Sequence, residues 1–227
     1  MQRSQRPCVE EARLAFEPPL DTHDRFYTMK ILIAGSTGKT GLRLTRQLIE
    51  AGHQPIALHR ASSDISQLPE GADKRQADLT DLPDDVCEGA DVVVFAAGSG
   101  GDTSAEMTDK VDRDGAKSLI DIAARSDVGH FVMLSAIGAD DPDPGSDLAH
   151  YLQAKHEADE HLIQSGLSYT IVRPVTLTED DGDRNMRLGE DVDPSGKAAR
   201  GDVAAILARS TTDTSLAGKA FAMESIG

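Results

Sequence analysis

Three regularly spaced glycines, Gly35, Gly38 and Gly41, constrain the fold of this chain more than any other feature. They follow an apolar run over residues 29–34 and lead into residues 42–50, where apolar side chains recur at helical spacing. A buried strand, a tight glycine turn and a helix start form a phosphate site, because the turn exposes backbone N–H groups and the helix N-terminus carries partial positive charge. The first glycine permits the turn, the second a close approach to a pyrophosphate, and the third close helix–strand packing.

The stretch Gly38-Lys39-Thr40 also resembles the end of a nucleoside-triphosphate P-loop. That motif needs a glycine where this chain has Ile33, so a dinucleotide site is favoured over a triphosphate site. A glycine-rich loop without a ligand is the alternative that the turn alone leaves open. The residues expected to contact the dinucleotide are Gly35, Ser36, Thr37, Gly38, Lys39, Thr40 and Gly41.

Length and charge restrict the class of protein. A chain of 227 residues is expected to form one domain with a substantial core. We find no apolar run long enough for a bilayer and no signal peptide, and the two cysteines form no disulfide framework or metal motif, so we expect a cytoplasmic protein without a metal. A net charge of −16 argues against nucleic-acid or membrane partners and favours a small-molecule substrate and a monomer or small homo-oligomer. The acidic composition fits salt adaptation or an ordinary acidic cytosolic protein.

Strand and helix patterns alternate from Met29 onward. Strands are predicted at 29–34, 54–59, 73–76, 91–96, 129–134 and 169–173, and helices at 39–51, 104–125 and 147–165, with shorter ones near 80–87 and 202–210. The alternation predicts an α/β fold, a Rossmann-type doubly wound parallel sheet with helices on both faces, in a single domain. Ligands of such sheets bind beyond the carboxyl ends of the strands.

The domain boundaries follow from composition. Residues 1–28 mix charge and proline without sustained periodicity, so we predict a poorly ordered N-terminal extension, or an upstream start with Met29 beginning the domain proper. Residues 29–227 are predicted to be the NAD(P)-binding Rossmann domain, with a small C-terminal substrate region at about 174–227. The polar segment 174–200 is predicted to be a loop over the site or a partly disordered surface segment.

Cofactor choice is predicted from the residue after the second strand. An acidic residue there would bond the ribose 2′-hydroxyl of NAD, but this chain has Arg60, which suits a 2′-phosphate. NADP(H) is therefore preferred over NAD(H), with Lys39 adding charge; a solvated surface arginine is the alternative. Asp78 is expected to accept a hydrogen bond from the adenine, or to cap a helix, while Leu79 packs on the ring. The small residues Ala96, Ala97 and Gly98 let a nucleotide cross the strand ends.

A candidate catalytic group follows the fifth strand. Ser135 ends that strand, and Tyr151 and Lys155 lie one turn apart on the next helix. Carbonyl reduction needs a proton donor beside the hydride acceptor, and a lysine ammonium stabilises a neighbouring phenolate. We assign Tyr151 as proton donor, Lys155 as its tuning residue and Ser135 as the group that orients the acceptor. A tyrosine and lysine on one helix face can also be ordinary core and surface residues.

Together these motifs resemble an atypical short-chain dehydrogenase/reductase of the NAD(P)-binding, NmrA-like, sugar-epimerase-like group. The resemblance extends from Met29 almost to the end of the chain, and the segments that carry it are 35–41, 78–79, 111–116, 134–135, 151–159, 168–174 and 200–204. The resemblance implies a Rossmann fold binding NADP(H), with Lys155 on the nicotinamide ribose and Pro174 among the cofactor-lining residues. Asp112 stands where many relatives have Asn, which weakens a proton-relay role at that position.

The leading functional hypothesis is an NADP(H)-dependent oxidoreductase acting on a small carbonyl or quinone-like substrate by a Tyr-x-x-x-Lys mechanism. Relatives often lack the tyrosine, so Tyr151 favours an enzyme. The short segment after Pro174 favours a small substrate or none. Two alternatives stay open: a non-catalytic NADP(H)-binding sensor or regulator, and an epimerase-like isomerase that uses a tightly bound cofactor.

Overall fold

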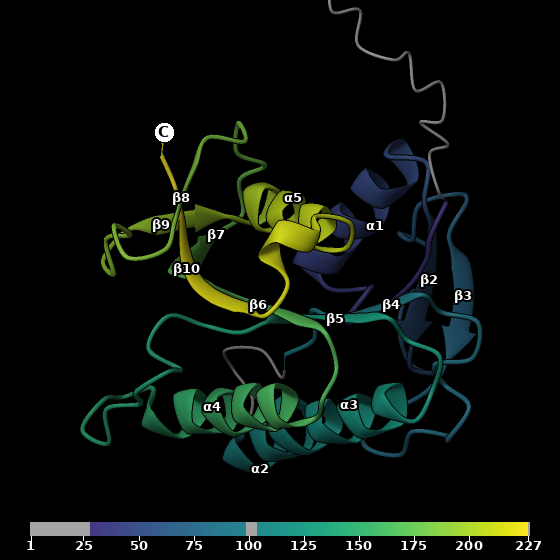
Figure 1. The fold of residues 1–227 in the computed structure, drawn as a ribbon, viewed down its shortest axis with the longest axis horizontal. Coiled ribbons are helices and arrows are strands. Elements are labelled where there is room, and N and C mark those ends of the chain that lie inside the picture. The colour runs from purple at the N-terminus through teal and green to yellow at the C-terminus, as the bar shows by residue number, and fades with distance from the viewer. Residues whose placement is uncertain (1–27, 99–103, 227) are drawn as a thin grey trace, which may run out of the picture.

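The computed structural model describes residues 28–98 and 104–226 (Figure 1). Nearly all of the predicted N-terminal extension, 1–28, lies outside the described residues. Across the described parts of the chain, no helix is both long and apolar enough to cross a membrane.

An eight-stranded sheet in the order β3-β2-β1-β4-β5-β6-β10-β8 forms the middle layer. Seven strands run parallel and β8 pairs antiparallel with β10 at one edge. The strands are β1 (Lys30–Ala34), β2 (Gln54–His59), β3 (Asp73–Gln76), β4 (Val92–Phe95), β5 (His130–Leu134), β6 (Tyr169–Pro174), β8 (Met186–Leu188) and β10 (Lys219–Ser225). The chain reverses its winding direction between β1 and β4, which is where such sheets bind ligands. The predicted doubly wound parallel sheet is confirmed.

Helices cover both faces of the sheet (Figure 1). On one face lie α1 (Lys39–Glu50) and α5 (Arg200–Ser210); on the other lie α2 (Ala105–Thr108), α3 (Ala116–Ala124) and α4 (Ala149–Gln164). Because strands covered on both sides must bury both sets of side chains, β4 and β5 are apolar at almost every position. Each face therefore has its own core. One contains Phe95, Phe131, Leu119 and Leu162, and the other Ile33, Val94, Leu44 and Ile206.

The predicted helix near 80–87 is wrong. This segment forms turns, with an isolated bridge between Asp78 and Asp81. The Asp78 carboxylate accepts hydrogen bonds from the backbone and hydroxyl of Thr80, and Pro83 disfavours helical backbone in the residue before it. Local hydrogen bonding of this kind competes with the helix.

The predicted helix 104–125 contains a π-helical turn, Asp109–Gly115, between α2 and α3. Each backbone hydrogen bond of such a turn spans one residue more than in an α-helix, and these turns often occur at functional sites. The insertion places Asp112 in the protein interior, where it is fully buried.

The segment predicted as loop, 174–200, carries short strands. β7 (Thr176–Thr178) pairs with β9 (Lys197–Ala199) in a two-stranded sheet, and β8 joins the main sheet. The strand β10 had no sequence prediction, because its alternation is weak and its burial depends on β6 and β8. With α5 packed on α1 and β10 in the main sheet, much of 174–227 belongs to the Rossmann body.

Shortening Phe131 to alanine should lower the free energy of unfolding by about 3–5 kcal/mol, because Phe131 is fully buried in the core under α3 and α4. Urea denaturation measures this loss. The control is Ile163→Ala on the exposed side of α4, which should change stability by less than about 0.5 kcal/mol. Equal losses for the two variants would contradict the described packing.

Candidate functional site

The glycine turn lies against the end of β4. Gly35 has a φ of +84°, and a Cβ there would lie 2.6 Å from the backbone of Ala97. A Cβ at Gly41 would collide with the Gly35 carbonyl. Both positions therefore require glycine, the first for the turn and the second for the approach of α1.

The start of α1 is suited to an anion. Gly38 caps the helix, and among the described residues no side chain accepts from this end. The first turn of α1, described throughout, also holds no acidic residue. Uncapped N–H groups with partial positive charge fit the phosphates of a dinucleotide, so the residues present fit the cofactor.

The other residues of the turn have different surroundings. Ser36 is fully buried and donates a hydrogen bond to the Leu58 carbonyl of β2, 2.7 Å away, so its side chain ties the turn to the sheet. Thr40 is buried and accepts from the Arg200 guanidinium. Thr37 is half-buried, while Gly38 and Lys39 are exposed.

Arg60 and Asp78 lie at the carboxyl ends of β2 and β3. Arg60 is exposed directly after β2. Hydrogen bonds from Thr80, together with the Arg60 charge, lower the pKa of Asp78. These bonds support the capping alternative for Asp78, since its carboxylate holds the Thr80 turn. Leu79 is partly buried beside Gly115, whose missing Cβ leaves room for it.

Ala96, Ala97 and Gly98 follow β4 at the same edge, next to the glycine turn. Ala96 continues the ladder by donating to Ala34. A Cβ on Gly98 would approach the Asp112 carboxylate to 3.3 Å, so a small residue suits this crossing. Pro174 ends β6 and is buried.

Tyr151 and Lys155 come together on α4 as predicted. The Lys155 ammonium lies 5.8 Å from the centre of the Tyr151 ring and the same distance from that of Phe95. It is buried and within 3.5 Å of the carbonyls of Ala97 and Leu134, at the ends of β4 and β5. The ammonium is thus held at the carboxyl edge of the sheet, beside the end of β4 that the glycine turn touches.

Asp112 pairs directly with Lys155. The two side chains are 2.9 Å apart, and both are essentially inaccessible to solvent. Burial lowers the pKa of Lys155, but the charges of Tyr151, Asp112 and Asp159 raise it by more, and its net direction is upward. Asp112 stands out in the sequence as a departure from relatives, but its pairing is not visible there, because it joins residues 43 positions apart on different helices.

Ser135 forms its described side-chain hydrogen bond with Asp159. Its hydroxyl donates to the Asp159 carboxylate, 2.8 Å away, and Arg173 also donates to that carboxylate. The Ser135 hydroxyl is thus bonded within the protein, and its expected role in orienting the acceptor stays a prediction.

Asp159, one turn of α4 after Lys155, is buried and accepts hydrogen bonds from both Ser135 and Arg173. Burial raises the pKa of Asp159, while Arg173 and Ser135 oppose that rise. Asp159 was present in the matched helix segment, but its partners come from β5 and β6 and could not be read from spacing.

Residues 179–184 form an acidic loop that sequence analysis did not connect with the glycine turn. Glu179 pairs with Lys39 at 2.8 Å, and Asp181 pairs with Arg43 at 2.6 Å. The acidic run Glu179-Asp180-Asp181 is visible in the sequence, but its place beside α1 is not.

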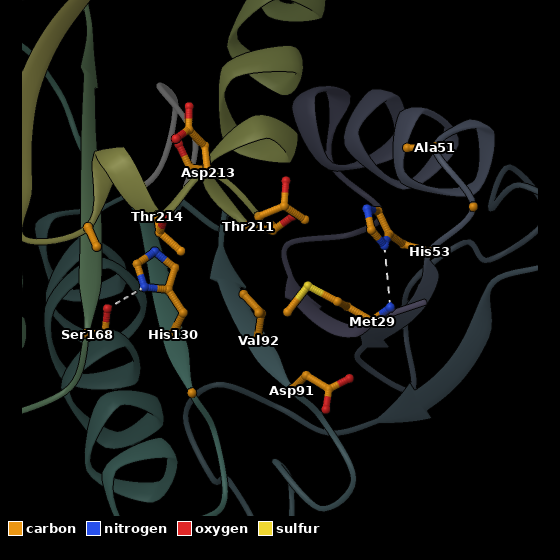
Figure 2. A pocket seen from close by; sticks show the side chains of 15 residues that line it. Met29, Ala51, His53, Asp91, Val92, His130, Ser168, Thr211, Asp213 and Thr214 are labelled. Atoms are coloured by element: carbon orange, nitrogen blue, oxygen red, sulfur yellow. Dashed lines mark hydrogen bonds between the residues drawn. The ribbon is translucent and has the colours of Figure 1, made fainter. Parts of the chain in front are cut away.

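A hollow of about 580 Å³ lies at the opposite, amino edge of the sheet (Figure 2). It is lined by residues that precede or begin strands, among them Met29, His53, Asp91 and His130, and by Thr211 after α5. Because Tyr151, Lys155 and the glycine turn lie at the carboxyl edge, this hollow is separate from the candidate site.

Comparison with known proteins identifies the family. The family described as NAD(P)H-binding matches residues 35–214, from the glycine turn to beyond α5. The chain belongs to this NAD(P)H-binding family. The match agrees with the turn geometry and confirms the predicted atypical short-chain dehydrogenase/reductase, NmrA-like resemblance.

Three similar proteins match this NAD(P)H-binding chain over most of their own length. The Bacillus subtilis protein YhfK, named an uncharacterized sugar epimerase, is 33% identical over 199 residues, covering 85% of this chain and 92% of its own. A solved Bacillus halodurans structure, provisionally described as an NAD-dependent epimerase/dehydratase, is 34% identical with a TM-score of 0.81, covering 87% and 94%. The oxidoreductase ylbE from Lactococcus lactis is 29% identical with a TM-score of 0.77, covering 87% and 91%.

Replacing Asp112 with asparagine should lower the pKa of Lys155, because the buried ammonium loses its closest negative charge. The free energy of unfolding should fall by about 3–5 kcal/mol at neutral pH. Since the folded-state pKa of Lys155 is raised, its contribution to stability is present below its ordinary pKa and is lost as pH rises through the raised value. NMR titration of ¹³C-labelled lysine, assigned with Lys155→Met, follows the pKa.

The matched control is Asp114→Asn, which also removes a carboxylate from the π-helical turn. The Asp114 side chain is more than half exposed and pairs with Arg113. It should leave the Lys155 titration unchanged. An unaltered Lys155 pKa in Asp112→Asn would contradict the assignment of the pair.

Proposed function

We propose that the protein is an NADP(H)-dependent oxidoreductase that reduces a small carbonyl or quinone-like substrate. The observation that carries the proposal is the Tyr151–Lys155 pair at the carboxyl edge of a sheet whose glycine turn fits a dinucleotide. Membership of the NAD(P)H-binding family and the likeness to the L. lactis oxidoreductase support the same reaction class.

When bound, the cofactor supplies or accepts a hydride. The protein's own residues must then manage the proton. Lys155 holds a buried positive charge 5.8 Å from the Tyr151 ring, and a cation beside a phenol stabilises the phenolate. Tyr151 would donate its hydroxyl proton to the acceptor oxygen, and its half-buried position leaves the ring within reach of a ligand. With Ser135 bonded to Asp159, Tyr151 is the proposed hydrogen-bond donor to the substrate.

Arg60 is the proposed determinant of NADP(H) preference. Its exposed guanidinium stands directly after β2, where a 2′-phosphate of an adenosine ribose is expected. A guanidinium can bind a phosphate with two hydrogen bonds, whereas the acidic residue of an NAD site would repel it.

Replacing Tyr151 with phenylalanine should lower the rate of NADPH oxidation, over a panel of carbonyl and quinone acceptors, by about 10²–10⁴-fold, because the proton donor is lost. Binding of NADPH should change little. Tyr169→Phe, at the start of β6, is the control and should retain activity. Equal rates in Tyr151→Phe and wild type would remove Tyr151 from the reaction.

Replacing Arg60 with glutamate should reverse the cofactor preference, because a carboxylate repels a 2′-phosphate and can accept from a ribose hydroxyl. Fluorescence titration with NADPH and NADH measures both affinities. The control Arg125→Glu makes the same charge change at an exposed arginine after α3 and should leave the ratio unaltered. A preference for NADPH that survives in Arg60→Glu would refute this role.

A second candidate is an epimerase-like isomerase that regenerates its own cofactor. The name of the 33% identical relative and the description of the B. halodurans structure favour it. Such an enzyme retains cofactor through purification and oxidises no net NADPH. Two measurements therefore separate the candidates: the ultraviolet absorbance of the purified protein, which reports retained cofactor, and a turnover assay, which reports NADPH oxidation.

A further inference from the structure

The acidic loop, residues 179–184, is fixed to the start of α5. The Gly201 N–H donates to the Asp180 carbonyl, and the Arg184 N–H donates to the buried Asp202 carboxylate. Asp202 also accepts from Ser225 of β10, 2.7 Å away. These bonds hold the loop at a defined place beside the first turn of α1.

The loop places its carboxylates on the cations at that turn. Glu179 lies 2.8 Å from the Lys39 ammonium and 3.2 Å from the Arg200 guanidinium. Arg43 donates to the Glu179 carbonyl and pairs with Asp181. Arg200 also donates to Thr40 in the first turn of α1, so Glu179 sits at the entrance to the glycine turn.

A physical reason favours an anion at this place. α1 brings no acidic residue of its own to its first turn, and no described side chain caps it. The helix N-terminus carries partial positive charge, and Lys39 and Arg200 add two full charges. Glu179 supplies negative charge from 140 residues away in the chain, and a phosphate would supply the same charge to the same groups.

We propose that Glu179 sets the affinity for the dinucleotide by competing with its phosphate groups for Lys39 and Arg200. The inference rests on the proposed function only in requiring that the cofactor phosphates reach this turn. Binding then exchanges a carboxylate for a phosphate on the same two cations. Lys39 and Arg200 lower the pKa of Glu179, so the competing carboxylate stays ionised at neutral pH.

The exchange limits the size of the effect. The Lys39 and Glu179 side chains are more than half exposed, and exposed ion pairs contribute little free energy because water screens them. Removing the Glu179 charge should therefore tighten binding by about two- to ten-fold. Salt weakens the carboxylate pairs and the phosphate contacts alike, so wild-type affinity should fall less steeply with salt than that of the variant.

The test compares Glu179→Gln with Asp180→Asn. Both remove one negative charge from the same loop, but the Asp180 carboxylate accepts from Thr178 and makes no described pair with Lys39 or Arg200. Isothermal titration with NADPH and with 2′,5′-ADP, at two salt concentrations, gives the affinities. Glu179→Gln should bind both ligands more tightly and with a steeper salt dependence, and Asp180→Asn should match wild type.

A further variant isolates the competition. In a Lys39→Ala background, Glu179→Gln should gain less affinity than in wild type, because one of the two contested cations is gone. Equal or weaker binding by Glu179→Gln in the wild-type background would overturn the inference while leaving the proposed function standing. Failure of all variants and of wild type to bind either ligand would overturn both.

Discussion

The parallel pairing of β1 between β2 and β4 is the constraint on which the candidate site depends. It aligns the carboxyl ends of three strands, so that the glycine turn after β1, Arg60 after β2 and Ala97 after β4 meet at one edge. Gly35 can turn there because it has no Cβ to collide with Ala97. Loss of this close approach would separate the turn from the rest of the site.

Buried charge is concentrated beneath that edge. Lys155 pairs with Asp112, and Asp159 pairs with Arg173, so each buried ion has a partner within about 3 Å. Such pairs are costly to bury and costly to break, which makes them weak sources of net stability and strong determinants of geometry. Here the pair with Asp112 helps to hold the Lys155 ammonium, which lies 5.8 Å from the centre of the Tyr151 ring. The π-helical turn, Asp109–Gly115, makes this possible by bringing Asp112 inward.

The surface of the same edge carries charges of both signs. The chain carries a net charge of −16, which would repel an anionic cofactor. Lys39, Arg43 and Arg200 lie near the glycine turn and could attract such an anion, but carboxylates of the acidic loop, residues 179–184, pair with all three. The affinity for an anion at this turn is thus a balance between two sets of exposed charges.

Local patterns in the sequence predicted the order of strands and helices, the parallel sheet and the glycine turn, because periodicity and glycine spacing are local properties. They also predicted that Tyr151 and Lys155 share a helix face. They failed at 80–87, where the Asp78 side chain competes for backbone hydrogen bonds, and at β10, whose burial comes from neighbours far along the chain.

The sequence by itself determined the fold class and the dinucleotide-type turn. Only the tertiary structure decided which charges meet. Asp112 reaches Lys155, Ser135 turns to Asp159 and Glu179 reaches Lys39, each across a gap of 24 to 140 residues. These contacts depend on how the helices and the acidic loop pack on the sheet. A one-turn shift of α4 would change the partners of Lys155 and Asp159, and a displaced acidic loop would change the partner of Lys39. No spacing along the chain carries that information.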